Sequence, residues 1–360
     1  MPAEVIASLD QVTPGWLTAV LLNDQALTAG AVSGFDVDAG RGNWSANAVL
    51  KLRYTADARG TLPARLFLKL VDAGDDSDGE FFGRSEVTYY THDYVDVDDA
   101  PIIHCYDAAF SDQLRRYHLL LDDVSLTHVE AAEKEPTLEY GLALAEGLAA
   151  LHARWWGADR LAQAGAPRHD AGHIRRFVTI AEPGARHIID AFSAQLQPGW
   201  PDLMRTLYAR HPQALVLRAA DASGFTLIHG DAGHNNVLVP RQGNRPIYII
   251  DRQPFDWSLT TWLGAYDLAY AMVLDWPVKL RRRLELPVLR RYYQQLIHRG
   301  IEAYDWQQLF DDYRLCVAMG VYIASEYCRG GINQRRLPVW LPMLQRSLTA
   351  IEDLHCAELW

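Results

Sequence analysis

The sequence is poor in cysteine, in long apolar runs and in basic charge. Its 360 residues include only four cysteines, and no two of them have the C-x-x-C spacing of a structural zinc site. Unpaired thiols suit a reducing, cytoplasmic setting. No run approaches the roughly 18 apolar residues of a membrane span. The N-terminus also lacks the basic-then-apolar pattern of a signal peptide. We therefore expect no membrane partner.

The charge balance is acidic, with 45 Asp and Glu against 34 Lys and Arg and a net charge of −11. A general nucleic-acid binder usually carries a basic stripe, so no nucleic-acid partner is expected. At 49% hydrophobic and 22% charged, the chain is too apolar for disorder. Its length allows two lobes, or one large domain, in a monomer or a homodimer.

The first third of the chain is strand-rich. Thr13-Pro14 predicts the N-cap and first position of a short helix. Runs of apolar and β-branched residues between 31 and 71, separated by turn sequences, predict a three-stranded antiparallel meander. One helix at 80–95 and two further strands follow. These elements together predict a small N-terminal lobe, residues 1–121.

The rest of the chain, residues 122–360, has mainly helical patterns. The strongest is at 135–157, and strand character returns only at 227–253. The expected fold class is therefore α+β, with a small antiparallel-sheet lobe that contains one key helix, and a larger helical lobe that contains one β-hairpin.

The hairpin stretch LIHGDAGHNNVLVPRQGNRPIYIIDRQ, residues 227–253, is unusually polar for two buried strands. If its turn is symmetric about the central Gly-Asn pair, Asn236 faces Asp251. Both then lie beside Asp231. Carboxylate and amide oxygens are the ligands that Mg²⁺ prefers, together with water and phosphate. The spacing therefore predicts a magnesium–phosphate site at the open end of the hairpin.

The order of these polar groups matches a known parts list. An Asp, an Asn five residues later and a second Asp after a hairpin occur in kinase phosphoryl transfer. With its HGD, NN and IDRQ motifs, the chain resembles the protein-kinase-like phosphotransferases of small molecules. These include the aminoglycoside phosphotransferase and choline kinase families, and the motifs are most similar to the ecdysteroid-kinase-like (CHK) branch. The resemblance implies a bilobal protein-kinase-like fold and ATP- and Mg²⁺-dependent phosphorylation of a small-molecule alcohol.

The resemblance also implies roles for five residues. Asp231 is the catalytic base or orients the substrate hydroxyl, and Asn236 and Asp251 bind magnesium. Lys69, on the third predicted strand, contacts the nucleotide phosphates, and Glu86 on the following helix holds it. A lysine among aliphatic strand residues needs a partner if it is buried, although it can also snorkel to solvent.

The remaining nucleotide contacts fall in two places. The glycine-containing loop between the first two strands covers the phosphates, and we expect Gly40, Gly42 and Asn43 to contribute. The sequence LLLDDV resembles the hinge that holds adenine through backbone hydrogen bonds, with Leu121 to Asp123 as contacts.

Supporting roles are expected for several neighbours. Glu80 is the alternative lysine partner if the helix register differs. Asn235 supports the loop, His229 is structural and bonds backbone near the metal site, and Asp267 anchors the catalytic loop. His234 contacts phosphate or substrate, or is simply a solvated loop residue.

The acceptor is poorly determined by sequence. Asp256, Trp257 and Trp262 follow the hairpin and are candidate contacts for an apolar or planar substrate, although core packing explains the tryptophans equally well. Arg252 departs from the family pattern. It lowers the pKa of its neighbouring carboxylate, pairs with a phosphate or points to solvent. Gln253 replaces the glycine of protein kinases, and no long activation loop follows it.

Two other functions compete with a kinase. One is a pseudokinase, an ATP-binding or scaffolding module. The other is a metal phosphohydrolase, which would need more His and Asp ligands over several loops and would not need Lys69 or Glu86.

Overall fold

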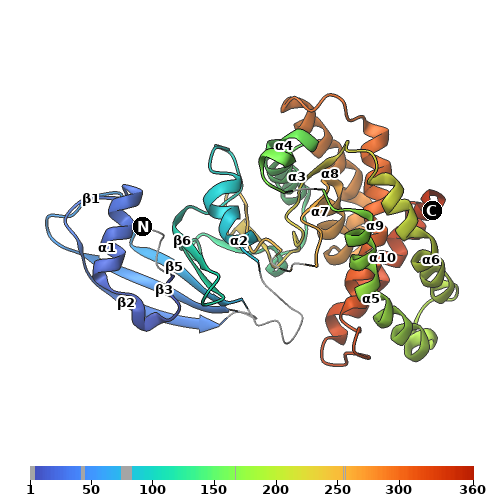
Figure 1. Ribbon diagram of the computed structural model, residues 1–360, viewed down its shortest axis with the longest axis horizontal. Helices are drawn as coiled ribbons and strands as arrows, with labels where there is room; N and C mark the ends of the chain where they lie inside the picture. Colours follow the sequence, from blue (N-terminus) through green and yellow to red (C-terminus); the bar gives the residue numbers. More distant parts are fainter. Residues whose placement is uncertain (1–4, 42–44, 74–82, 167, 254, 256) are drawn as a thin grey trace.

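The structure is a computed structural model of the chain, and it describes residues 5–41, 45–73, 83–166, 168–253, 255 and 257–360. A twisted sheet occupies one end of the molecule and a helical bundle the other, with the short helix α2 (Ser85–Thr88) between them (Figure 1). The expected α+β class and bilobal arrangement are therefore confirmed.

The main sheet is antiparallel throughout, with strand order β2-β3-β5-β7-β6. Its strands are β2 (Val32–Arg41), β3 (Ser45–Tyr54), β5 (Arg65–Asp72), β6 (Cys105–Ser111) and β7 (Arg116–Asp122). A smaller pair, β1 (Leu27–Ala29) and β4 (Arg59–Gly60), lies beside it. The predicted meander corresponds to β2, β3 and β5.

One face of this sheet is covered by α1 (Pro14–Asp24). The helix begins as predicted, because the Thr13 hydroxyl accepts a hydrogen bond from the Trp16 N–H. Side chains alternate along a strand, so Leu66 and Leu68 of β5 pack toward α1. Lys69 then points to the opposite face, toward α2. The alternation of β5 thus places the charged side chain of Lys69 on the face of the sheet opposite α1.

The predicted helix at 80–95 is shorter and differently wound. α2 continues directly into a π-helical turn, η2 (Tyr89–Asp93), and residues 80–82, which include Glu80, lie outside the described residues. A π turn holds more residues than an α turn. Here the wider turn accompanies the burial of Tyr89, Tyr90 and Asp93 together. The helix end is therefore fixed by packing and not by periodicity.

The larger lobe contains the α-helices that follow β7. They are α3 (Leu138–Arg154), α4 (Ala158–Gln163), α5 (Ala171–Phe192), α6 (Trp200–Arg218), α7 (Ala265–Ala269), α8 (Val278–His298), α9 (Trp306–Glu326) and α10 (Leu337–Asp353). A second π-helical turn, η5 (Tyr270–Asp275), follows α7. In both lobes together, the short 3-10 turns are η1 (Leu9–Gln11), which precedes α1, and η3 (Ala131–Glu133), η4 (Ser193–Gln195) and η6 (Cys356–Leu359). The predicted helix at 135–157 corresponds to α3.

Two small sheets carry the catalytic region on this lobe. One has the order β11-β10-β8, from β8 (His128–Glu130), β10 (Val237–Pro240) and β11 (Tyr248–Ile249). The other pairs β9 (Phe225–Leu227) with β12 (Thr261–Leu263). The predicted single hairpin is thus β10–β11, reinforced by β8.

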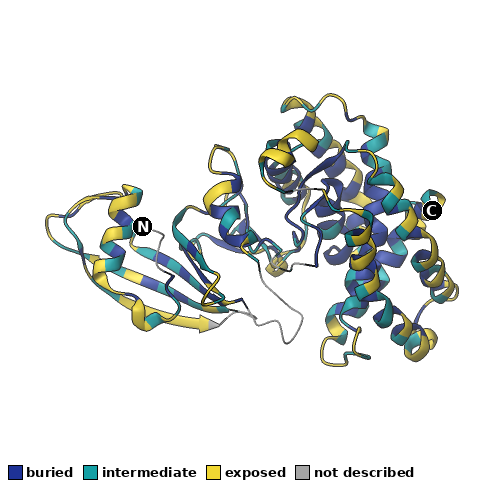
Figure 2. Ribbon diagram, in the orientation of Figure 1, coloured by how far each residue is buried: buried dark blue, intermediate teal, exposed yellow. Residues whose placement is uncertain are grey.

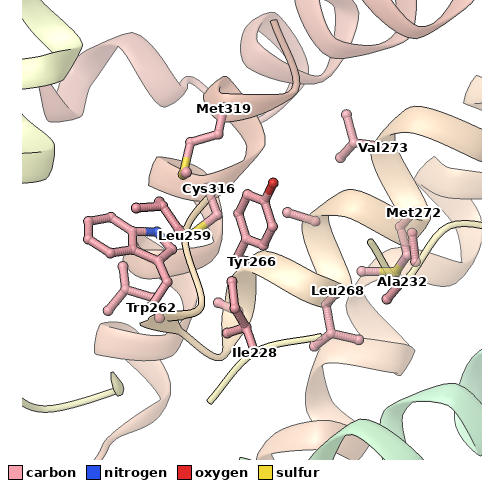
Figure 3. Packing of buried hydrophobic residues seen from close by; sticks show 14 of the residues in the cluster. Ile228, Ala232, Leu259, Trp262, Tyr266, Leu268, Met272, Val273, Cys316 and Met319 are labelled. Carbon is pink, nitrogen blue, oxygen red and sulfur yellow. The ribbon is translucent and has the colours of Figure 1, made fainter. Parts of the chain in front are cut away.

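The main core lies inside the helical lobe, where buried residues run along the facing sides of the helices (Figure 2). Trp262, Tyr266, Cys316 and Met319 meet in its centre (Figure 3). All four cysteines are free thiols. Within the described part of the chain, every helix is too short or too polar to cross a membrane.

Candidate functional site

The hairpin register differs from the expected one by a single residue. Val237 pairs with Ile249, and the Asn236 carbonyl accepts a hydrogen bond of 2.9 Å from the Ile250 N–H. The prediction that Asn236 faces Asp251 is therefore wrong. Asp251 leaves the strand in the left-handed region, at φ 59°, so it turns out of the hairpin instead of continuing the ladder.

Asp251 turns toward the N-terminal sheet and meets Lys69. The Lys69 Nζ donates to Asp251 Oδ1 over 2.9 Å and to Glu86 Oε1 over 2.7 Å. The lysine side chain is 12% exposed, that of Glu86 3% and that of Asp251 45%. The Tyr117 hydroxyl donates to the other oxygen of Glu86 over 2.5 Å. The predicted Lys69–Glu86 pair is confirmed, and its contact with phosphate stays a prediction.

In this cluster, the ammonium of Lys69 and the neighbouring carboxylates change one another's pKa values. Burial disfavours the ammonium of Lys69, but the carboxylates of Glu86 and Asp251 outweigh burial and raise its pKa. Burial likewise opposes charge on Asp251, yet Lys69 holds the pKa of that carboxyl below its usual range. Burial dominates at Glu86 and raises its pKa to about 7. The more exposed of the two carboxylates, that of Asp251, is thus kept ionised.

The Asp267 carboxylate holds the backbone of the loop that precedes Asp231. Its two oxygens accept hydrogen bonds from the backbone N–H groups of His229, over 2.6 Å, and Gly230, over 2.9 Å. His152 Nε2 lies 3.0 Å from the same carboxylate, and its Nδ1 lies 2.7 Å from the Tyr292 hydroxyl. The predicted anchoring role of Asp267 is confirmed.

His229 is a buried structural residue, as expected. Its Nδ1 accepts a hydrogen bond of 3.3 Å from the Asp231 N–H, and its ring packs edge-on against Tyr89. Burial lowers its pKa to about 4. A neutral imidazole that accepts from the loop backbone holds Asp231 in place without exchanging a proton.

Asp231 lies in a partly closed, acidic setting. Burial raises its pKa to about 7, against a hydrogen bond from Tyr270, while Asp251 and Asp275 add to the rise. The Asn236 amide nitrogen donates to the Asp231 carbonyl over 2.9 Å, and magnesium binding by the amide oxygen stays a prediction. A carboxyl with this pKa is suited to accept a proton near neutral pH.

Sequence reasoning missed Tyr270 and Asp275. Both lie in η5, and Asp275 Oδ2 accepts a hydrogen bond of 2.7 Å from the backbone N–H of His234. Burial raises the pKa of Asp275 to about 7. The only available signal was that both residues follow Asp267 within eight positions. His234 itself is partly exposed, and Asn235 is exposed. The contact of His234 with phosphate or substrate and the support of the loop by Asn235 both stay predictions.

The nucleotide side of the site is described only in part. Gly40 pairs with Asn47 near the end of the β2–β3 hairpin, and Asn47 in turn pairs with Lys69. Gly40 and Lys69 therefore lie in the same row across the sheet, two strands apart. Gly42 and Asn43 lie outside the described residues.

The expected hinge, Leu121 to Asp123, overlaps the end of β7. Leu121 pairs with residues of both β5 and β6. The Asp123 carboxylate accepts from Arg65 Nε over 2.6 Å and from the Ser125 N–H over 3.0 Å. Its side chain is thus committed to the protein, so an adenine contact here would use the backbone.

The expected acceptor contact at Trp262 is wrong. The indole is fully buried, edge-on to Phe225 in the helical core. Trp257 is almost buried and stacks on Phe255 and Phe177, and Asp256 lies outside the described residues. A surface depression of about 610 Å³ on α5 touches none of these residues, being lined by Gly172, Arg176, Thr179, Ile180, Pro183 and Arg329.

Arg252 neither faces solvent nor reaches toward phosphate. Its side chain is 4% exposed, and Nη1 donates to Asp93 Oδ2 over 2.5 Å. Asp93 is the last residue of η2, so the guanidinium bridges the hairpin and the helix that carries Glu86. This contact agrees neither with a role in lowering the pKa of Asp251 nor with a role in pairing with a phosphate.

No cluster of three or more His, Cys, Asp or Glu side chains suited to a metal occurs among the described residues. Magnesium in nucleotide sites needs only one or two protein oxygens, because water and phosphates complete its coordination. Asp251 and Asn236 fit that smaller set.

Comparisons with models of protein families and with curated proteins gave no match. Solved structures match over nearly the whole chain. A choline kinase from Cryptosporidium parvum Iowa II has a TM-score of 0.57 at 11% identity, covering 96% of this chain and 98% of its own. A Plasmodium vivax ethanolamine kinase has a TM-score of 0.53 at 11% identity, covering 96% and 84%. A GDP complex of an aminoglycoside 2′-phosphotransferase-IIIa mutant has a TM-score of 0.50 at 14% identity, covering 96% and 98%.

These likenesses define the class of fold. The chain has the protein-kinase-like fold found in phosphotransferases of small molecules. At such low identity the likeness extends to the fold and not to the substrate. The resemblance to the ecdysteroid-kinase-like branch stays a prediction.

Proposed function

We propose that the protein is an ATP- and Mg²⁺-dependent kinase that phosphorylates a hydroxyl of a small molecule. One observation carries the proposal: Lys69 Nζ lies 2.7 Å from Glu86 and 2.9 Å from Asp251. The three residues come from β5, α2 and the segment after β11. A metal-binding hairpin alone has no need of a buried lysine, whereas a phosphate-binding site does.

Each residue of the site has a proposed role that follows from its position. Asp251 and Asn236 would hold magnesium, and Lys69 would contact the α- and β-phosphates beneath the loop that contains Gly40. When bound, the metal would neutralise charge on the β- and γ-phosphates. Asp231 would align the acceptor hydroxyl and take its proton. Most of the acceleration would then come from positioning and fixed charge.

Nucleotide choice and the acceptor are part of the proposal. A solved structure of the same fold was determined with GDP, so both ATP and GTP belong in the test. A small alcohol is the expected partner, and the acidic net charge of −11 disfavours nucleic acid.

The test is a screen with γ-labelled ATP and GTP over choline, aminoglycosides, macrolides, sterols and hydroxyacyl thioesters. We expect label transfer to one class of alcohol. Asp231→Asn and Asp251→Asn should each reduce turnover by about 10³-fold or more. Asp159→Asn on the surface of α4 is the control and should leave turnover unchanged.

Two outcomes would contradict the proposal. Near-normal transfer by either active-site variant would remove the assigned roles. Magnesium-dependent nucleotide binding without transfer to any alcohol would instead favour an ATP-binding module without catalysis.

A further inference from the structure

A buried ion pair joins the segment around Asp251 to the helix that carries Glu86. Arg252 and Asp93 are 4% and 7% exposed, and their charged groups are 2.5 Å apart. A charge buried this deeply is stable only when it is paired and hydrogen-bonded. The pair therefore cannot open without leaving an uncompensated charge in the interior.

The ion pair does not act alone. On one side of Asp251, the Tyr89 hydroxyl donates to the Ile249 carbonyl over 3.0 Å. On the other side, the Ser85 hydroxyl donates to the Gln253 carbonyl over 2.7 Å. α2 and η2 are therefore attached to the 249–253 segment at three points, and Asp251 lies between them.

Asp93 is itself fixed to both lobes. Its carboxylate contacts His92 Nδ1 at 3.0 Å and accepts from the Thr88 hydroxyl over 3.2 Å. Its carbonyl accepts a hydrogen bond of 2.8 Å from Trp155 Nε1, which follows α3. Arg252 thus pairs with a group that is already held by the helical lobe.

The backbone at Asp251 needs such support. A non-glycine residue in the left-handed region persists only where its surroundings determine its conformation. The chain on either side is held by the Ile250 N–H on the Asn236 carbonyl and the Gln253 N–H on the His229 carbonyl. Within this stretch the Arg252 side chain makes the buried ion pair with the helix of Glu86.

We propose that Arg252 is a positioning residue that keeps α2 and η2 closed against Asp251 whether or not nucleotide is bound. The Lys69–Glu86–Asp251 cluster would then be assembled permanently, and the kinase would need no activation step. This inference rests on the proposed function for its catalytic consequence, but the closed helix is a property of the free protein.

The first test measures the free protein. Amide hydrogen exchange is compared for the wild type, Arg252→Met and Arg252→Lys in residues 86–93 and 249–253. Because Met leaves the Asp93 carboxylate buried without its arginine partner, we expect exchange in both segments to rise together by about tenfold or more. The Lys variant should lie between the other two. Unchanged exchange in Arg252→Met would overturn the inference, even if the protein proves not to be a kinase.

The second test measures ligand binding. Titration calorimetry with Mg²⁺ and a non-hydrolysable ATP analogue should show affinity reduced by about 10–100-fold in Arg252→Met. Affinity for the analogue without Mg²⁺ should change less, because Asp251 is the displaced ligand. Equal losses with and without Mg²⁺ would contradict a role in placing Asp251.

A partly buried ion pair elsewhere controls for general destabilisation. Arg218 and Asp312 form this pair in the helical lobe, with contacts of 2.5 and 2.7 Å and side chains that are 16% and 3% exposed. Arg218→Met should lower the melting temperature as Arg252→Met does, but leave exchange in 86–93 and Mg²⁺-dependent binding unchanged. Should Arg252→Met not fold, the double variant Asp93→Asn with Arg252→Gln, which buries no charge, replaces it with the same expected changes.

Discussion

Lys69 shows how much a single residue can reveal at the sequence level. A cationic side chain within the aliphatic run LFLKLV predicted a partner for a buried ammonium. The family resemblance named Glu86 on the next helix as that partner, and the 2.7 Å contact agrees with it. The contact with Asp251, 182 positions away, was not predicted.

Replacing Lys69 by Met tests its role directly. We expect kcat/KM for the nucleotide to fall by about 10²–10³-fold, since one preorganised positive group is lost from the phosphate site. The fold should survive, because Glu86 keeps its hydrogen bond from Tyr117 and can bind a proton. Steady-state kinetics with varied ATP would measure the effect.

Lys51→Met is the control for this change. That lysine lies on the neighbouring strand β3 with about half its side chain exposed. Kinetics altered equally by both substitutions would mean that charge on the sheet, and not the site, is responsible.

Arg252 marks the limit of residue-level prediction. Its partner Asp93 is 159 positions away and lies in a helix whose end the sequence pattern misplaced. An arginine beside a metal ligand has several plausible partners, and only the tertiary structure selects among them. The prediction for Trp262 was wrong for a related reason, because tryptophans near a site have the same sequence pattern whether they line a pocket or fill a core.

Among the elements, long periodic helices and alternating strands were predicted well, and their ends were not. The hairpin was expected, but its register was off by one, because the pairing of Val237 with Ile249 centres the turn on Gly243 and not between Gly243 and Asn244. The π turn at Tyr89–Asp93 was not predictable, since burial of two tyrosines and an aspartate determines it. Local pattern thus gave the kind of element, and long-range packing gave its boundaries.

The packing of α5 on α9 gives a prediction at the element scale. A Cβ at Gly184 would lie 1.8 Å from the backbone carbonyl oxygen of Ser325. Backbone cannot move aside as a side chain does, so the helices would separate. Gly184→Ala should lower the free energy of unfolding by about 1–3 kcal/mol, although Ala is favoured within helices by about 1 kcal/mol.

Urea denaturation would measure this effect, with Gly15→Ala as the control. Gly15 lies in the first turn of α1, and the nearest atom to an added Cβ is 3.8 Å away. That variant should be neutral or slightly stabilised. A Gly184→Ala protein as stable as the wild type would show that α5 and α9 do not pack as closely as described.

For the whole molecule, the helical core is sensitive to acid. His211 on α6 is fully buried, with Nε2 3.0 Å from the Leu315 carbonyl and Nδ1 2.8 Å from the Tyr322 hydroxyl. Burial lowers its pKa to about 3 from an ordinary value of 6.5. Below pH 6.5 the unfolded chain therefore binds a proton at His211 that the folded chain does not bind. The free energy of unfolding then decreases as the pH is lowered.

His211→Gln removes this linkage. We expect the wild type to lose up to about 1.4 kcal/mol per pH unit more than the variant between pH ~6.5 and ~3. Above that range the difference between them should be constant. Denaturant unfolding at several pH values would show this, and the exposed His298→Gln should keep the wild-type dependence. Parallel pH profiles for the wild type and His211→Gln would disprove the assignment.

The ammonium of Lys69 has a consequence for the free protein as a whole. It already gives Asp251 a positive partner before any nucleotide arrives. Under the proposed function, a metal–nucleotide complex would therefore replace a resident counterion instead of neutralising a bare carboxylate. In the free protein the lysine joins the two lobes through its contacts with Glu86 and Asp251, and it would exchange Asp251 for the phosphates when nucleotide binds.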